Sequence, residues 1–166
     1  MIKLALVLIG LISFYLHGYY FSTGDQSTYV PQVLKRVDPS LYQRDYLAQT
    51  AEGELSFMFP LMAAIIKTTN INIEWFYFLL YVAIRLLTVF VIYQLSFTLT
   101  KSRPTALLAS LILSLPKFVA GTNQPTLDNS LLPRFLGLPL LLLGLSYLAQ
   151  SRFVLAAFLT GIIFTL

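Results

Sequence analysis

Apolar residues in this chain are gathered into long blocks that contain almost no charged side chains. A helix needs about 20 such residues to cross a bilayer, because the hydrocarbon is roughly 30 Å thick and each helical residue advances about 1.5 Å. We therefore predict transmembrane helices at 2–21, 73–99, 104–120, 134–150 and 153–166. The last block reaches only about 21 Å as a helix, so we expect the chain to continue beyond Leu166 in its natural form.

The composition agrees with a membrane location for these blocks. Of the 166 residues, 57% are hydrophobic and 11% are charged, and the mean hydropathy is +0.77. A soluble domain usually carries about 25% charged residues, so this chain has too few of them to cover a water-exposed surface. The predicted fold is all-α, a polytopic transmembrane helix bundle that forms a single module over residues 1–166, with the lipid bilayer as its surroundings.

The net charge of +4 fits either nucleic-acid binding or anchoring at a membrane surface. The 11 basic residues are scattered along the chain, most of them near the ends of the predicted helices, and form no cluster, which favours anchoring over a nucleic-acid partner. Lys3 ahead of the first block also fits a cleaved signal peptide. That block ends in Tyr19, Tyr20 and Phe21, which are typical of an interfacial aromatic belt, so we favour a retained helix.

The connections between the predicted helices alternate in length. Residues 22–72 and 121–133 form long connections, whereas 100–105 and 150–152 are short, so both long connections are expected on one side of the membrane. A simple count of basic residues places that side in the cytoplasm. The positive-inside rule is strongest for short loops, however, and Lys101 and Arg103 lie together in one. We therefore predict a cytoplasmic N-terminus, with 22–72 and 121–133 as outer loops.

The first outer loop is expected to contain short interfacial helices. Asp38 followed by Pro39 is typical of a helix start, which predicts a helix over 39–48. The apolar segment 57–66 is about half the length of a span and predicts an interfacial or re-entrant helix. If this segment crosses the membrane instead, the orientation of every later helix is inverted.

Asp25 is the leading candidate for a catalytic residue. It follows the first block by four positions, so its carboxylate is expected at the boundary between lipid and water, where it can act as a general base. The alternative is a structural role as the cap of a helix beginning at Gln26, which Pro31 would bend or interrupt. The remaining acids of this loop are interpreted mainly as solvated surface charge; they are Asp38, Asp45, Glu52 and Glu54.

The second outer loop contains one acid, Asp128, which faces the same compartment as Asp25 if the loops alternate as predicted. Asp128 either begins a turn or contributes to a site shared with Asp25. Arg134 follows at the start of the fourth block. An arginine there either extends to lipid headgroups or binds a phosphate through two parallel hydrogen bonds.

Arg85 lies near the middle of the second block. An unpaired charge at that depth is costly, so we expect its side chain to face the interior of the bundle or water and to have a partner, which the sequence does not identify. The single histidine, His17, lies inside the first block, where a role in helix packing or at the interface is favoured over metal ligation.

Three short stretches share a further pattern: Gly24-Asp25-Gln26 with Tyr29 and Pro31, Asp38-Pro39-Ser40-Leu41-Tyr42 with Asp45, and Leu132-Pro133-Arg134-Phe135. Together with the alternation of loops, they resemble the N-terminal module of the C-type glycosyltransferases, which are polytopic enzymes that take sugars from polyprenyl-phosphate donors. The likeness is greatest to the bacterial branch related to protein and lipid mannosyltransferases, which implies a location in the bacterial inner membrane.

The resemblance implies roles for individual residues. Asp25 matches the catalytic acid of the family's first loop, and Asp128 matches the acid of its second loop. The leaving lipid phosphate requires positive charge, for which the candidates are Arg134, Lys117 and Arg44. Some relatives use a divalent metal at this place. Protein mannosyltransferases carry an Asp-Glu pair after the first helix, and here Gln26 replaces the second acid, which leaves the metal and the class of acceptor open.

Two other classes of function remain as alternatives. A transporter or flippase would place a polar cavity at mid-depth around Arg85. A non-catalytic membrane subunit would only pack against a partner through its apolar helices. The enzyme hypothesis requires Asp25 and Asp128 to approach one cavity at the outer surface, close enough for a single substrate to contact both.

Overall fold

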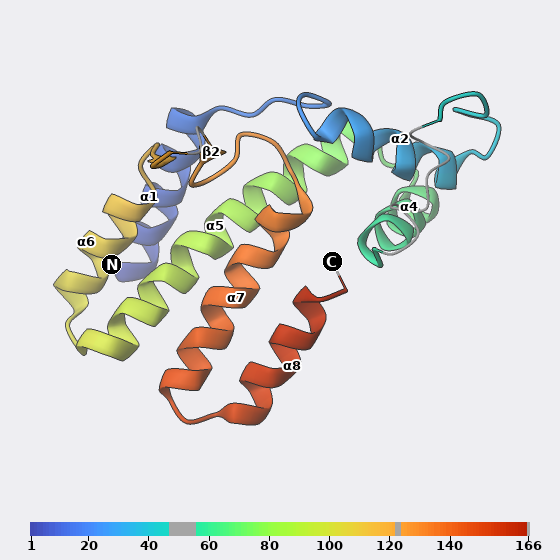
Figure 1. Cartoon of the computed structure of the whole chain (residues 1–166). Coiled ribbons are helices and arrows are strands. Elements are labelled where there is room, and N and C mark those ends of the chain that lie inside the picture. The colour runs from blue at the N-terminus through green and yellow to red at the C-terminus, as the bar shows by residue number, and fades with distance from the viewer. Residues whose placement is uncertain (47–55, 122–123, 166) are drawn as a thin grey trace.

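The computed structural model describes residues 1–46, 56–121 and 124–165, which form seven helices and two very short strands (Figure 1). In chain order the elements are α1 (Ile2–His17), α2 (Gln26–Val37), α4 (Met58–Thr69), α5 (Ile73–Thr100), α6 (Arg103–Leu113), β1 (Phe118–Val119), β2 (Gln124–Pro125), α7 (Pro133–Ala149) and α8 (Phe153–Ile163). The prediction of a helical fold is confirmed. The strands pair antiparallel, with Phe118 opposite Pro125.

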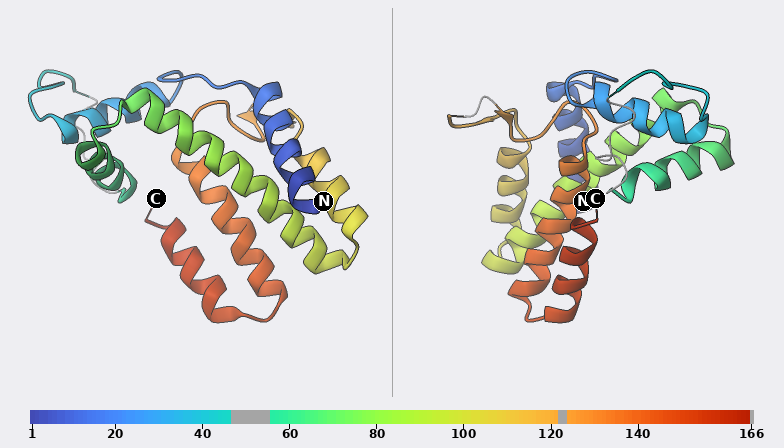
Figure 2. Two further views of the ribbon diagram at one scale, coloured as in Figure 1. Left: turned by 180° about the vertical axis from the view of Figure 1, so that it is seen from behind. Right: turned by 45° about the vertical axis from the view of Figure 1, so that its right-hand side comes forward.

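The 28-residue helix α5 runs through the middle of the molecule (Figure 1). Helices α1 and α6 pack on one flank of α5, α7 packs on the other, and α8 packs on α7. The two long connections lie at the end of the bundle where α1 finishes and α7 begins, and the two short connections lie at the opposite end (Figures 1 and 2). The predicted alternation of connections therefore agrees with the arrangement of the helices.

Helix boundaries follow from local chemistry. The side chain of Asn72 accepts hydrogen bonds from the N–H groups of Glu74 at 2.8 Å and Trp75 at 3.4 Å, which caps the start of α5. Ser102 caps α6 in the same way through the N–H of Thr105 at 3.4 Å, and Pro133 opens α7, where its missing N–H costs nothing.

The predicted spans match the helices unevenly. The ranges 73–99 and 134–150 agree with α5 and α7 within a residue at each end. The range 2–21 is too long, because Gly18 adopts φ +70° and ends α1 at His17. The range 104–120 is also too long, because Pro116 disfavours helical geometry in the preceding residue and α6 ends at Leu113. The range 153–166 corresponds to α8, which ends at Ile163.

Among the described residues, α5 alone is long and apolar enough to cross a bilayer by length and composition. Helices α1, α4, α6, α7 and α8 are apolar and have 10–17 residues each. The structure thus contains one candidate membrane span by this criterion.

The first long connection contains α2 and α4, which lie against each other and crosswise to α1, α6 and α7 (Figure 2). The segment predicted at 57–66 is α4, and α2 continues through Pro31 without interruption. The predicted helix over 39–48 is wrong for residues 39–46, which form turns. The carboxylate of Asp38 accepts the N–H and hydroxyl of Ser40 at 2.9 and 2.7 Å, which favours a turn over a helix start. Residues 47 and 48 lie outside the described part.

The apolar core lies between these crosswise helices and the start of α5. Val33 and Tyr81 are completely buried, and Tyr29 stacks on Phe59 with ring centres 5.5 Å apart. The other buried members of this cluster are Val30, Met58, Phe59, Met62, Ala63, Ile66, Tyr77, Leu131 and Phe135. The cluster joins α2, α4, α5 and α7 and so packs the helices of the first long connection against the bundle.

Candidate active site

A cleft of about 480 Å³ opens at the end of the bundle that carries the two long connections. Its walls come from the end of α1, the segment between α1 and α2, the segment from α6 to α7 and the first turn of α7. Asp25, Lys117, Asp128 and Arg134 all line it. Two carboxylates and two cationic side chains therefore share one hollow, although they come from segments far apart in the sequence.

Arg134 is the centre of this arrangement. Its Nε and Nη2 donate to the two carboxylate oxygens of Asp128 at 2.9 Å each, in the parallel geometry that suits a guanidinium and a carboxylate. Its Nη1 lies 3.6 Å from a carboxylate oxygen of Asp25. One guanidinium thus links the acids of both connections, which is the juxtaposition that the enzyme hypothesis requires.

The two acids differ in their access to solvent. The side chain of Asp25 is 62% exposed, whereas that of Asp128 is 10% exposed. Asp25 precedes α2, but its carboxylate makes no capping hydrogen bond. The side chain of Asp25 therefore does not cap α2, which was the structural alternative. Asp25 is accessible to a substrate in the cleft, and Asp128 is the more fixed of the two.

Direct hydrogen bonds join the two acid-bearing connections. The N–H of Tyr20 donates to the carbonyl of Asn129 at 2.9 Å. The buried amide of Gln26 accepts from the N–H of Ser22 at 2.5 Å and donates to the carbonyl of Leu131 at 3.2 Å. Gln26, which the sequence singles out only because it replaces an acid, is therefore a bridge between the connections.

Arg85 is completely buried and faces the interior of the bundle, as predicted. Its Nη2 donates to the hydroxyl of Tyr81, one turn earlier on α5, and to the backbone carbonyl of Asp128. The guanidinium carbon also lies 5.0 Å from the centres of the Tyr81 and Phe135 rings. Tyr81 was not among the predicted site residues, and its spacing of four residues from Arg85 is the signal that could have found it.

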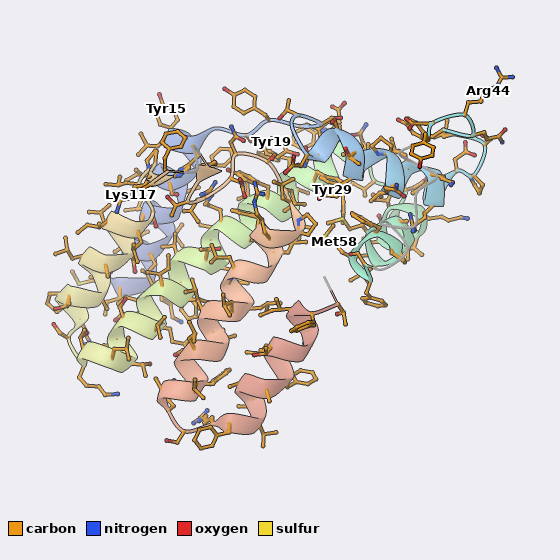
Figure 3. The ribbon with its side chains drawn as sticks, in the orientation of Figure 1. Tyr15, Tyr19, Tyr29, Arg44, Met58 and Lys117 are labelled. Carbon is orange, nitrogen blue, oxygen red and sulfur yellow. The ribbon has the colours of Figure 1, made fainter. Side chains whose placement is uncertain are left out.

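The remaining predicted cations separate into two cases. Lys117 lines the cleft, whereas Arg44 is exposed and lies in the turn region beyond α2 (Figure 3). In that figure Arg44 and Lys117 are at opposite sides of the molecule, so the structure does not bring Arg44 to the other four residues. The physical reason is that α2 lies crosswise to the bundle and carries the chain away from the cleft.

His17 also lines the cleft. Its Nδ1 lies 2.8 Å from the carbonyl oxygen of Ser13, one turn earlier in α1. A carbonyl only accepts, so Nδ1 carries the proton. His17 is thus bonded within its own helix, in agreement with the packing role that we favour.

The residues present do not fit the divalent metal that the resemblance to C-type glycosyltransferases leaves open. No group of three His, Cys, Asp or Glu side chains in the described ranges is arranged to hold a metal ion. The carboxylates of Asp25 and Asp128 both pair with Arg134, so an ion between them would have to displace the guanidinium. The cationic partner of these acids in this structure is a side chain of the chain itself.

Comparison with known proteins adds no relative. No protein-family model matches the chain, and no curated protein or solved structure matches it. The resemblance to C-type glycosyltransferases therefore rests on the short sequence stretches and the loop alternation described above.

Proposed function

We propose that the chain is a polytopic membrane glycosyltransferase that moves a sugar from a polyprenyl-phosphate donor to an acceptor hydroxyl at the outer face of a bacterial inner membrane. The observation that carries the proposal is the meeting of Asp25 and Asp128, from two separate connections, on the guanidinium of Arg134 in one open cleft. Acids and cations in a single hollow suit a reaction between a neutral hydroxyl and an anionic donor.

The exposed surface supports the membrane part of the proposal. Large apolar side chains are exposed on the outer faces of α1, α6 and α8, among them Leu8 at 51%, Leu108 at 56% and Phe158 at 65%. Such faces are unfavourable in water and are covered by lipid chains in a bilayer. Helices shorter than a full span are accommodated by local thinning of the bilayer.

The charges at the helix ends support the proposed orientation. Lys101, Arg103 and Arg152 lie at the end of the bundle with the short connections, and basic residues of short loops are retained in the cytoplasm. The cleft lies at the other end and therefore opens on the outer face, where the sugar of a lipid-linked donor would meet it.

Asp25 is proposed as the general base. The acceptor oxygen attacks the anomeric carbon of the sugar, and its proton passes to the carboxylate of Asp25. The bond between the anomeric carbon and the phosphate oxygen breaks, and the polyprenyl phosphate leaves with the electron pair. Arg134 and Lys117 supply positive charge to stabilise that developing phosphate, while Asp128 holds Arg134 in place.

The transporter hypothesis receives less support. It requires a polar cavity around Arg85, whereas the cleft described above is lined by the two connections and by the ends of α1 and α7, and Arg85 is not among its lining residues. Arg85 is instead packed against the rings of Tyr81 and Phe135, which stack on each other. These contacts fit a fixed internal group better than a group on a substrate pathway.

The direct test replaces Asp25 by Asn in the full chain and measures sugar transfer from a polyprenyl-phosphate sugar in membranes. Loss of the base is expected to lower the turnover number about 10²–10⁴-fold. Asp38→Asn is the matched control, since Asp38 is an exposed acid of the same connection and does not line the cleft. Unchanged turnover in Asp25→Asn rejects the base assignment, and absence of transfer by the unaltered protein rejects the activity.

A further inference from the structure

Tyr81 and Arg85 form a buried pair on consecutive turns of α5 that contacts backbone far away in the sequence. Nη2 of Arg85 donates one hydrogen to the hydroxyl oxygen of Tyr81 and the other to the carbonyl of Asp128. The hydroxyl of Tyr81 in turn lies 3.0 Å from the carbonyl of Gly18 and 3.1 Å from that of Asp128. The pair therefore holds two backbone carbonyls that are separated by more than a hundred residues.

Each of these carbonyls belongs to one of the acid-bearing connections. Gly18 is the first residue after α1 and begins the segment that leads to Asp25. Asp128 carries the second acid itself, and its side chain points to Arg134 while its carbonyl points to Arg85. A single anchor on the long helix thus binds the backbone of both connections.

The arginine is an expensive way to fill this position, since a buried charge must be compensated. Its guanidinium carbon lies 5.0 Å from the centres of both the Tyr81 and Phe135 rings, and its Nε and Nη1 have no hydrogen-bond partner among the described residues. Among the described residues only Nη2 of Arg85 forms hydrogen bonds, one with the Tyr81 hydroxyl and one with the Asp128 carbonyl. These two bonds offset part of the cost of burying the charge.

We propose that Tyr81 and Arg85 are positioning residues that set the separation of the Asp25 and Asp128 carboxylates across the cleft. The geometric part of this inference is independent of the chemistry, and the kinetic part rests on the proposed function. Neither side chain lines the cleft, so both act through the backbone of the two connections.

The geometric part is tested by distance measurement. The chain has no cysteine, so nitroxide labels can be attached to Cys residues introduced by Thr23→Cys and Asn129→Cys, at exposed positions on the two connections. Tyr81→Phe retains the ring and removes the hydroxyl. We expect the label-to-label distance distribution, measured by pulsed electron spin resonance, to be narrow in the parent and clearly broader or shifted in Tyr81→Phe.

Tyr77→Phe is the matched control. Tyr77 lies one turn earlier on α5 and is 1% exposed, and its hydroxyl has no hydrogen-bond partner in the described part of the chain. The same deletion there should leave the distance distribution unchanged. Equal distributions in Tyr81→Phe and Tyr77→Phe overturn the inference.

Arg85→Met provides a second variant, because it keeps the length of the side chain and removes the charge and both Nη2 hydrogen bonds. It is expected to broaden the distribution while the chain stays folded, because the hydrogen-bond acceptors of the guanidinium are a hydroxyl and a backbone carbonyl, so its removal leaves no buried charge unpaired. A label-to-label distance distribution as narrow as that of the parent would contradict the role of Arg85. The role of Tyr81 is then decided by the Tyr81→Phe variant alone.

The kinetic part uses the same variants in the transfer assay. Misplaced acids should lower the turnover number about 10- to 100-fold in Tyr81→Phe, with the KM for the donor unchanged. Because a loss of folded protein also lowers the apparent turnover number at constant KM, turnover is expressed per molecule of folded protein, quantified by size-exclusion chromatography in detergent. Broadened distances with normal turnover refute only the kinetic part, and a parent without transfer refutes the proposed function but not the positioning.

Discussion

Gln26 follows Asp25 directly, and its amide is completely buried between the two connections. An amide both accepts and donates, as its contacts with Ser22 and Leu131 require, whereas a carboxylate only accepts. We therefore expect Gln26→Glu to lose the bond to Leu131 and to bury a charge or an extra proton, with a destabilisation of at least about 1–3 kcal/mol. The measurement is thermal unfolding in detergent, with the exposed Gln43→Glu as the control. Equal melting temperatures in the two variants would show that the bridge is not formed.

Arg134 contributes geometry as well as charge. Its two parallel bonds to Asp128 need a planar guanidinium, and the ammonium of lysine cannot reproduce them. A hydrogen bond to a charged group is worth about 1.5–3 kcal/mol, so Arg134→Lys is expected to lower kcat/KM of the proposed sugar transfer about 10- to 100-fold. Arg103→Lys, at the opposite end of the bundle, makes the same exchange on an exposed arginine. Equal kcat/KM values in Arg134→Lys and Arg103→Lys would show that Arg134 contributes only its positive charge.

At the scale of elements, α4 is held to α2 by one buried face. Met62 is 3% exposed and belongs to the shared core, whereas its neighbour Leu61 is 46% exposed. Truncation of a buried methionine leaves a cavity, so Met62→Ala is expected to lower the free energy of unfolding by about 2–5 kcal/mol, and Leu61→Ala by far less. Chemical denaturation of both variants in detergent checks the difference. A larger effect of Leu61→Ala would mean that the opposite face of α4 is the packed one.

The existence of the helices was predictable, but some of their ends were not. Apolar blocks locate α5 and α7 well, because in both cases a strong boundary residue, Asn72 or Pro133, coincides with the edge of the block. Hydropathy alone extends the predicted helices past Gly18 and Pro116, since it carries no information on a positive φ or on a missing N–H. Asp38 followed by Pro39 predicted a helix, and the hydrogen bonds of Asp38 with Ser40 instead favour a turn.

At the scale of the molecule, the sequence indicated four of the residues that line the cleft but not what holds them together. Loop alternation was enough to put Asp25, Asp128 and Arg134 on one side. The hydrogen bonds that hold them join distant residues. The bond of Tyr81 with Gly18 spans 63 residues, and the bond of Gln26 with Leu131 spans 105. No local pattern encodes contacts at such separations. Arg44 was misplaced for the same reason, because its distance from the cleft depends on the crosswise direction of α2.

The proposed orientation of the chain in the membrane decides whether the cleft can meet the proposed outer-face substrate. Ser27, on α2, and Thr100, at the end of α5, are both exposed and lie at opposite ends of the bundle. In the cysteine-free chain, Ser27→Cys should react with a membrane-impermeant maleimide in intact cells, and Thr100→Cys only after permeabilisation, because Lys101 and Arg103 retain that end inside. The reverse pattern would place the cleft in the cytoplasm and exclude an outer-face reaction. Reaction of both residues in intact cells would show that α5 does not cross, and the polytopic arrangement would then fail with it.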